Sequence, residues 1–310
     1  KGSAVRVAEV LRDVAGQYKK KVFLYLNDNN EDKINELKKH LPGEKDNFRI
    51  VTSVKDANIF LKEIGPKLDN RRYHYHFFLL YDPYDASIDW AALAPFFRHW
   101  GEVLINHMVS DPIRALSQVK SDRAKQKYMD TYLIDDVTKL IPFGSDKNAY
   151  EKRLETIIKY LRGDKSRKYY IASFPFFNTN NALVYDLVHC TSHIEGFKLF
   201  KTTAWNTFGR KSSTKTTSFS GQTVITYSED SLDIETETDQ NCYFAEDIAK
   251  YIQKHFNGQQ DVKYSDIWAL LDEHPIFPTD GYKNEIKQIL VADYGATKKQ
   301  STISFQDRRK

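Results

Sequence analysis

The 310-residue chain has only two cysteines, Cys190 and Cys242, and no Cys-x-x-Cys spacing. Two cysteines cannot build a disulfide framework, and the common zinc and iron–sulfur ligand patterns are missing. No apolar run approaches the ~18 residues of a membrane helix, and the first residues lack the apolar centre and cleavage site of a signal peptide. These absences predict a soluble, cytoplasmic protein that carries no metal ion of its own.

Several catalytic motifs are missing as well. The sequence has no Gly-x-Ser-x-Gly, no Walker loop and no His-Glu-x-x-His, which removes the easily recognised hydrolases, nucleotide triphosphatases and zinc proteases. A net charge of +4, from 46 basic and 42 acidic residues, neither requires nor opposes a nucleic-acid partner. With 41% hydrophobic and 14% aromatic residues, the chain can nevertheless bury one large core or two unequal ones.

Short apolar runs alternate with helical segments in the first half of the chain. The runs cover residues 22–26, 48–52, 77–81 and 102–108. This alternation predicts βαβ units and an α/β domain built on a doubly wound, Rossmann-like parallel sheet, with strands buried on both faces. Two further strand-like runs, separated by the turn-rich residues 178–181, predict an antiparallel hairpin that closes the sheet.

The last third of the chain has a different texture. Residues 209–241 are rich in Ser, Thr and charged side chains, which is typical of a polar linker or an extended loop. Residues 242–310 contain three amphipathic segments and a strand-like run, an order that predicts a winged-helix-like domain. The expected domains are therefore 1–208 and 242–310, joined by 209–241.

Four lysines of the last domain could face a phosphate backbone: Lys283, Lys287, Lys298 and Lys299. The alternative is a small protein-docking domain whose lysines are only solvated, since four lysines are ordinary for a module of this size. Both interpretations stay open at this point.

Parallel strands with helical crossovers and a final antiparallel pair resemble the fold of S-adenosylmethionine-dependent methyltransferases, whose ligand lies at the carboxyl ends of the strands. Asp28 follows the first apolar run, where a carboxylate can accept both ribose hydroxyls, although it can equally cap the helix that starts near Glu31. Asp56 follows the second run, where this fold often binds the adenine amino group, and a helix cap is again the alternative.

The segment Asp82-Pro83-Tyr84 stands at the end of the third apolar run. An acidic residue, a proline and an aromatic ring at a strand end can hold an amine or a base by a hydrogen bond and by stacking while a methyl group is transferred. Asp82 and Tyr84 are therefore the candidate catalytic residues. The structural alternative is that Pro83 simply ends the strand, because proline cannot donate to a sheet.

Together, "LLYDPYDASIDWAAL", "VTSVKDANIFL", "CTSHIEGFKLFKTTAW" and "SDIWALLDEHPIFPTDGYKNEIKQIL" resemble the three-Cys-motif partner family (TcmP). The likeness covers most of the chain outside residues 209–241, and the Asp-Pro-Tyr segment and the His193-x-x-Gly196 helix entry carry it. The resemblance implies a methyltransferase-like protein that accompanies a radical-S-adenosylmethionine-like protein bearing three cysteines.

The resemblance also implies a first strand and a glycine-rich loop just before the equivalent of Gly2-Ser3-Ala4. Neither is present in the 310 residues, so we expect weak or no binding of S-adenosylmethionine by these residues alone. Two functions remain open. One is a methyltransferase that could act on nucleic acid; the other is a non-catalytic scaffold or nucleic-acid-binding partner with a degenerate methyltransferase fold.

Overall fold

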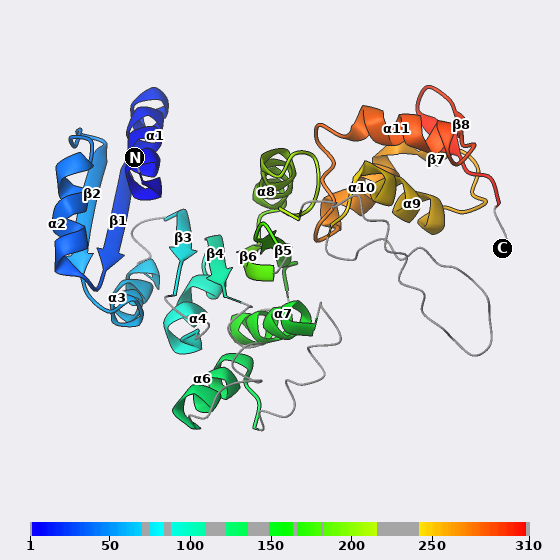
Figure 1. The fold of residues 1–310 in the computed structure, drawn as a ribbon. Helices are drawn as coiled ribbons and strands as arrows, with labels where there is room; N and C mark the ends of the chain where they lie inside the picture. The colour runs from blue at the N-terminus through cyan, green and yellow to red at the C-terminus, as the bar shows by residue number, and fades with distance from the viewer. Residues whose placement is uncertain are drawn as a thin grey trace. The chain divides into compact units, whose positions relative to one another are not determined.

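The computed structural model describes residues 2–69, 75–83, 88–108, 122–135, 149–163, 166–180, 183–215 and 242–307. The chain is of the α/β class, with helices and both parallel and antiparallel strand pairs (Figure 1). It divides into two compact units, Lys1–His74 with Asp89–Pro95, and Tyr75–Ile88 with Phe96–Lys310. Among the described residues, none of the helices is both long and apolar enough to cross a membrane.

The first unit is built on a parallel pair of strands. Its elements are α1 (Ser3–Tyr18), β1 (Val22–Asp28), α2 (Glu31–His40), β2 (Phe48–Val54), α3 (Ala57–Ile64), the 3-10 helix η1 (Gly65–Asp69) and the start of α4 (Trp90–Arg98). Strands β1 and β2 pair from Val22 opposite Phe48 onwards. Ala8 and Ala15 of α1 pack on Phe48, so α1 covers one face of the pair.

The second unit contains a four-stranded sheet in the order β3-β4-β6-β5. The strands are β3 (Phe77–Tyr81), β4 (Gly101–His107), β5 (Tyr170–Phe177) and β6 (Leu183–Thr191), and the helices beside them are α6 (Asp122–Tyr132), α7 (Ala149–Arg162) and α8 (Ile194–Thr207). Strands β3 and β4 are parallel, whereas β6 is antiparallel to both β4 and β5. The parallel pairs and the final antiparallel pair predicted from the sequence are thus present.

The expectation that the strands are buried on both faces is correct for β4 and wrong for β1 and β3. Alternate side chains are exposed in both strands: Phe23 (54%) and Tyr25 in β1, and Phe78 (59%) and Leu80 in β3. The reason in β1 is that α1 packs on the face that carries Val22 and Leu24, so Phe23 and Tyr25 lie on the face that α1 does not cover.

Helices α7 and α8 lie on opposite faces of the second sheet (Figure 1). His189 of β6 stacks on Phe200 of α8, with ring centroids 4.2 Å apart. The next residue, Cys190, points to the other face, where the charge of Glu155 on α7 helps to raise its pKa, although burial is the larger cause. Successive residues of β6 therefore belong to two different layers.

The C-terminal module contains α9 (Ala245–His255), β7 (Val262–Lys263), α10 (Tyr264–Glu273), α11 (Lys283–Ala292), β8 (Thr297–Lys298) and β9 (Thr302–Ser304). Its three strands form a sheet in the order β7-β9-β8. Phe197 and Trp205 of α8 belong to the same buried cluster as Ile248 and Leu271 of the module. Helix α8 therefore shares one apolar core with the C-terminal helices.

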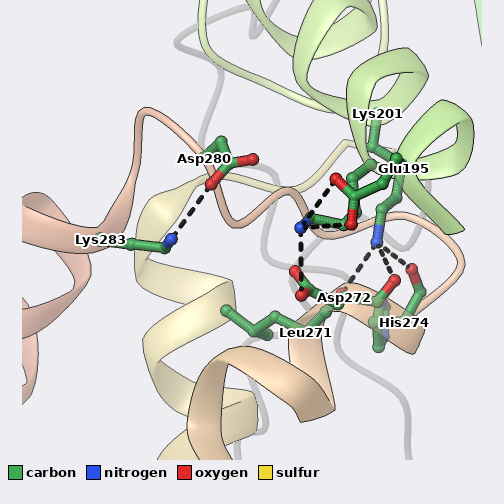
Figure 2. Close-up of polar contacts among 8 residues, drawn as sticks. Glu195, Lys201, Leu271, Asp272, His274, Asp280 and Lys283 are labelled. Atoms are coloured by element: carbon green, nitrogen blue, oxygen red, sulfur yellow. Dashed lines mark hydrogen bonds and ion pairs between the residues drawn. The ribbon is translucent and has the colours of Figure 1, made fainter. Parts of the chain in front are cut away.

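Lys201 of α8 supplies the polar part of this junction (Figure 2). Its buried ammonium donates hydrogen bonds to the carbonyl oxygens of Leu271, Asp272 and His274, at 2.8, 3.0 and 2.7 Å. It also lies 4.6 Å from the centre of the Phe197 ring. Burial lowers the pKa of Lys201 to about 7, and the three carbonyls at the end of α10 offset part of this desolvation.

The residues that follow α8 are hydrogen-bonded to the start of the C-terminal module. The backbone N–H of Ser212 donates to the carbonyl of Tyr243 at 3.0 Å, and the N–H of Tyr243 donates to Ser212 Oγ at 2.8 Å. Residues 212 and 243 thus lie side by side, although residues 216–241, outside the described part, separate them in sequence. The boundaries 1–208, 209–241 and 242–310 stay a prediction.

Candidate functional site at the strand ends

Asp28 is the last residue of β1, as the sequence predicted for a strand-end carboxylate. Its Oδ1 accepts a hydrogen bond from the backbone N–H of Asn30 at 2.9 Å. The side chain that caps α2 is Asn30, whose Oδ1 accepts from the N–H of Lys33 at 3.1 Å. Asp28 therefore supports the turn before the cap, and its role toward a ribose stays a prediction.

Asp56 is the N-cap of α3, which is the structural alternative for this residue. Its Oδ1 accepts from the N–H groups of Asn58 and Ile59, at 2.9 and 3.2 Å. Asp28 and Asp56 belong to the first unit and Asp82 to the second. A common pocket for the three carboxylates therefore also stays a prediction.

Asp82 follows β3 directly and is exposed. Its Oδ1 accepts a hydrogen bond from Asn106 Nδ2 at 2.7 Å. Because a carboxylate can only accept, this bond fixes the amide of Asn106 with its nitrogen toward Asp82. The buried Oδ1 of Asn106 has no hydrogen-bond partner among the described residues. Tyr84, the second candidate catalytic residue, lies outside the described residues.

The pairing of β3 with β4 explains why Asp82 and Asn106 lie side by side. Tyr81 of β3 is the register partner of Ile105 of β4, so the next residue of each strand reaches the same end of the sheet. Both strands run in the same direction, and this end is their carboxyl end. In open α/β sheets it is the end where ligands bind.

An aromatic wall stands beside Asp82. The ring of Tyr185 on β6 stacks on Phe176 of β5 with centroids 4.5 Å apart and an interplanar angle of 18°. Phe208 meets Phe176 edge-on at 5.0 Å and 87°, which holds the stack in place. Partial burial and then the nearby Asp82 carboxylate raise the pKa of Tyr185. The sequence analysis missed Asn106 and Tyr185, because only the register brings them to Asp82.

A buried polar layer lies on the other face of the same strand ends. His107 of β4 is the register partner of Asp186 of β6, and its Nε2 lies 2.8 Å from the Tyr132 hydroxyl. Burial lowers the pKa of His107 to about 4 and raises the pKa of Asp186 to about 7. Within the described part of the chain, His107 Nδ1, Asp186 Oδ1 and Ser173 Oγ have no hydrogen-bond partners.

The amino end of β4 carries a different, paired arrangement. Glu102 Oε2 lies 2.8 Å from Nε2 of the buried His189, and this bond is the main reason why the pKa of Glu102 is lowered. A Cβ at Gly196 would lie 2.3 Å from Glu102 Oε1. His193 caps α8 by accepting from the N–H of Gly196 at 3.3 Å. The His-x-x-Gly helix entry therefore has a structural cause: His193 caps the helix, and Gly196 leaves room for the Glu102 carboxylate of β4.

The four C-terminal lysines do not share one environment. Lys287 lies 4.0 Å above the Tyr264 ring, and Lys283 lies 3.1 Å from Asp280 and 5.9 Å from the centre of the Trp268 ring. Lys299 pairs with Asp261 at 2.5 Å, and Lys298 is exposed on β8. Three of the four cations therefore already have an acidic or aromatic neighbour.

No family model matches the chain, and no curated protein matches it. In the described ranges, no group of three His, Cys, Asp or Glu side chains is placed to hold a metal ion.

Proposed function

We propose that the chain is a Rossmann-like, S-adenosylmethionine-dependent methyltransferase-like protein with a winged-helix-like C-terminal domain, and that Asp82, positioned by Asn106, holds the methyl acceptor. The observation that carries this proposal is the Asp82–Asn106 pair at the carboxyl ends of two parallel strands. One oxygen of Asp82 is engaged by Asn106, and the Oδ1 of Asn106 has no partner in the described residues. The exposed Asp82 carboxylate thus keeps a second oxygen for an amino group, and Asn106, whose Oδ1 is buried, holds the carboxylate in place.

This arrangement suits an acceptor amine. If the amine donates an N–H to Asp82, which Asn106 holds in place, its lone pair is oriented away from the carboxylate, toward the incoming methyl group. The nitrogen gains positive charge as the new bond forms, and the adjacent Asp82 carboxylate stabilises that charge. Tyr185 restricts the acceptor on one side. Tyr84 is proposed as a second aromatic contact.

The strand-end carboxylates of the first unit fit the donor groups of S-adenosylmethionine. Bound S-adenosylmethionine would supply the electrophilic methyl group. Asp28 uses Oδ1 for its turn, and a carboxylate has a second oxygen that can accept ribose hydroxyl hydrogens. Asp56 likewise caps α3 through Oδ1, which is compatible with accepting from an adenine amino group. A three-cysteine radical-S-adenosylmethionine-like protein is the proposed partner.

The test is methyl transfer from labelled S-adenosylmethionine to amine acceptors, with the full-length native protein and its variants Asp82→Asn and Asn106→Ala. We expect each variant to lower kcat/KM by about 100-fold, the scale of a lost orienting interaction, with an unchanged unfolding midpoint. Asp46→Asn, at an exposed turn residue, is the matched control and should keep full activity. Equal activity of Asp82→Asn and the unaltered chain would contradict the proposal.

A second function is favoured by the capping bonds of Asp56 and the turn bond of Asp28, because these bonds explain both residues without any cofactor. In this case the chain is a non-catalytic scaffold for the three-cysteine protein, or a nucleic-acid-binding partner. Calorimetry of the full-length native protein with S-adenosylmethionine separates the two functions, because the 310 residues alone are expected to bind it weakly or not at all. No heat of binding, together with stable co-purification of the three-cysteine protein, would favour the scaffold.

A further inference from the structure

Residues 210–215 form a fixed segment at the carboxyl end of β5. Thr214 Oγ1 accepts from the N–H of Phe177 at 2.6 Å and lies 3.2 Å from the Phe177 carbonyl oxygen. Ser212 and Ser213 are buried at 2% and 0% exposure, and Ser212 is bonded to Tyr243. The segment is therefore anchored to both the sheet and the C-terminal module.

This segment places two ammonium groups next to the end of β5. Lys215 Nζ lies 5.4 Å from the centre of the Phe177 ring, and Lys211 Nζ donates to the carbonyl oxygen of Lys215. The third cation, Arg210, turns instead to Glu285 and to the ring of Tyr282, 4.5 Å away. Lys211 and Lys215 are thus the basic side chains of this edge.

The two lysines and Asp82 lie along one edge of the sheet. Strand β6 is antiparallel to both β4 and β5, so β3, β4 and β5 all run in one direction and end at the same edge. With the strand order β3-β4-β6-β5, three inter-strand gaps separate Asp82 from Phe177, or about 14 Å at the usual spacing. The Tyr185–Phe176 stack lies between them.

A carboxylate, a stacked aromatic pair and two lysines in a row match the parts of a nucleotide chain. A carboxylate accepts from the exocyclic amine of a base, an exposed ring stacks on any base, and lysines contact phosphates. A base can reach a ring and a carboxylate in this way only when it is unpaired. A small amine bound at Asp82 would not extend to the lysines, because they lie beside the end of β5, three inter-strand gaps from β3.

We propose that this edge binds a single-stranded nucleic acid, with an unpaired amino-bearing base against Tyr185 and Asp82 and with phosphates at Lys211 and Lys215. The proposal rests on the proposed function for the role of Asp82 and adds the class of acceptor. It puts the nucleic acid at the sheet edge, whereas from the sequence the C-terminal lysines were one open possibility beside a protein-docking domain.

The test is fluorescence anisotropy of the full chain with labelled single-stranded RNA and DNA of about 12 nucleotides, a length within the usual range of single-strand sites. We expect Lys211→Gln with Lys215→Gln to weaken binding about 10-fold and to reduce the slope of log K against log salt by about 1.4, the value for two phosphate contacts. Tyr185→Leu should weaken binding by about 5- to 10-fold without changing the salt slope, because stacking releases no counterions.

The matched control is Lys298→Gln with Lys299→Gln, which removes the same charge from the C-terminal module and should leave binding unchanged. The proposal is overturned if this control binds single strands more weakly while the Lys211 and Lys215 double variant binds them fully. It is also overturned if the unaltered chain binds a duplex or a lysine-rich peptide more tightly than a single strand. Chemical unfolding of each variant verifies that it is folded.

The binding assay requires neither cofactor nor methyl transfer. If single strands bind as described and no methylation occurs, the proposed function fails and the nucleic-acid site stands. If small amines or peptides are methylated and single strands do not bind, the nucleic-acid site fails and the methyltransferase stands.

Discussion

Two polar regions of the second unit differ in how completely their groups are paired. At the junction of α8 with the C-terminal module, the buried Lys201 ammonium has three carbonyl partners, one for each of its hydrogens. At the strand ends, Asp82 is exposed, and Asn106 Oδ1 and His107 Nδ1 have no partners in the described residues. Completely paired buried groups hold a fold together, whereas an exposed carboxylate with a single hydrogen bond, such as Asp82, can receive a ligand.

The largest expected loss of stability comes from the junction of α8 with the C-terminal module. Lys201→Met keeps most of the side-chain volume and leaves three carbonyls without their donor, so we expect a loss of about 3 to 5 kcal/mol in the free energy of unfolding. Urea unfolding followed by tryptophan fluorescence measures this loss, since Trp205 is buried in the same core and donates to the carbonyl of Ile276 at 3.0 Å.

Lys283→Met is the control for this prediction, because Lys283 forms an ion pair with Asp280 near the surface (Figure 2). Such exposed pairs contribute about 0 to 1 kcal/mol, and we expect a loss within that range. Equal losses for Lys201→Met and Lys283→Met would mean that the buried carbonyl cluster does not stabilise the junction.

The buried layer beneath the strand ends predicts a dependence of stability on pH. The pKa of His107 is about 4 in the folded chain, below its ordinary 6.5, so the unfolded chain binds more protons between these values and stability falls as the pH drops through this window. Between pH 7 and pH 5 we expect the natural chain to lose about 2 kcal/mol more than His107→Gln.

Asp186 has the opposite sign, because its pKa is raised to about 7 and the folded chain binds its proton more tightly. Asp186 therefore increases the free energy of unfolding of the chain as the pH falls below 7. Comparing the two chains by urea unfolding at pH 7, 6 and 5 separates the His107 contribution from the Asp186 contribution. Parallel stability curves for the natural chain and His107→Gln would show that His107 is not held neutral by the fold.

A smaller loss of stability is expected when the hydrogen bond between Glu102 and His189 is disturbed. Gly196→Ala places a Cβ where Glu102 Oε1 now lies, so the carboxylate has to move and its bond to His189 is weakened. Alanine is the better helix former, and the net loss should be about 1 kcal/mol. Gly16→Ala in α1 is the matched control: nothing lies within 4 Å of its Cβ, and it should gain about 0.5 kcal/mol in thermal unfolding.

Local signals in the sequence located the strand ends but not the site built on them. An apolar run followed by Asp-Pro identifies Asp82 at the end of β3, because proline cannot continue the ladder. Asn106 is 24 residues away and Tyr185 lies on a third strand, so their approach to Asp82 depends on pairing register, which no local pattern contains. Gly196 of α8 is a similar case, because the group that leaves no room for a side chain there is the Glu102 carboxylate of β4.

The smallest expected effect on stability belongs to Asp82, which sharpens the comparison with Lys201. Asp82 is exposed and makes one hydrogen bond, so Asp82→Asn should change the free energy of unfolding by less than about 0.5 kcal/mol. Asp56→Ala, which removes the cap of α3, should cost about 1 kcal/mol in the same urea experiment. A carboxylate that can be removed at no cost in stability, while acceptor binding is lost, is positioned for a ligand rather than for the fold. If Asp82→Asn instead costs as much as Asp56→Ala and acceptor binding is unaffected, then Asp82 holds the turn after β3 and the strand ends belong to the scaffold.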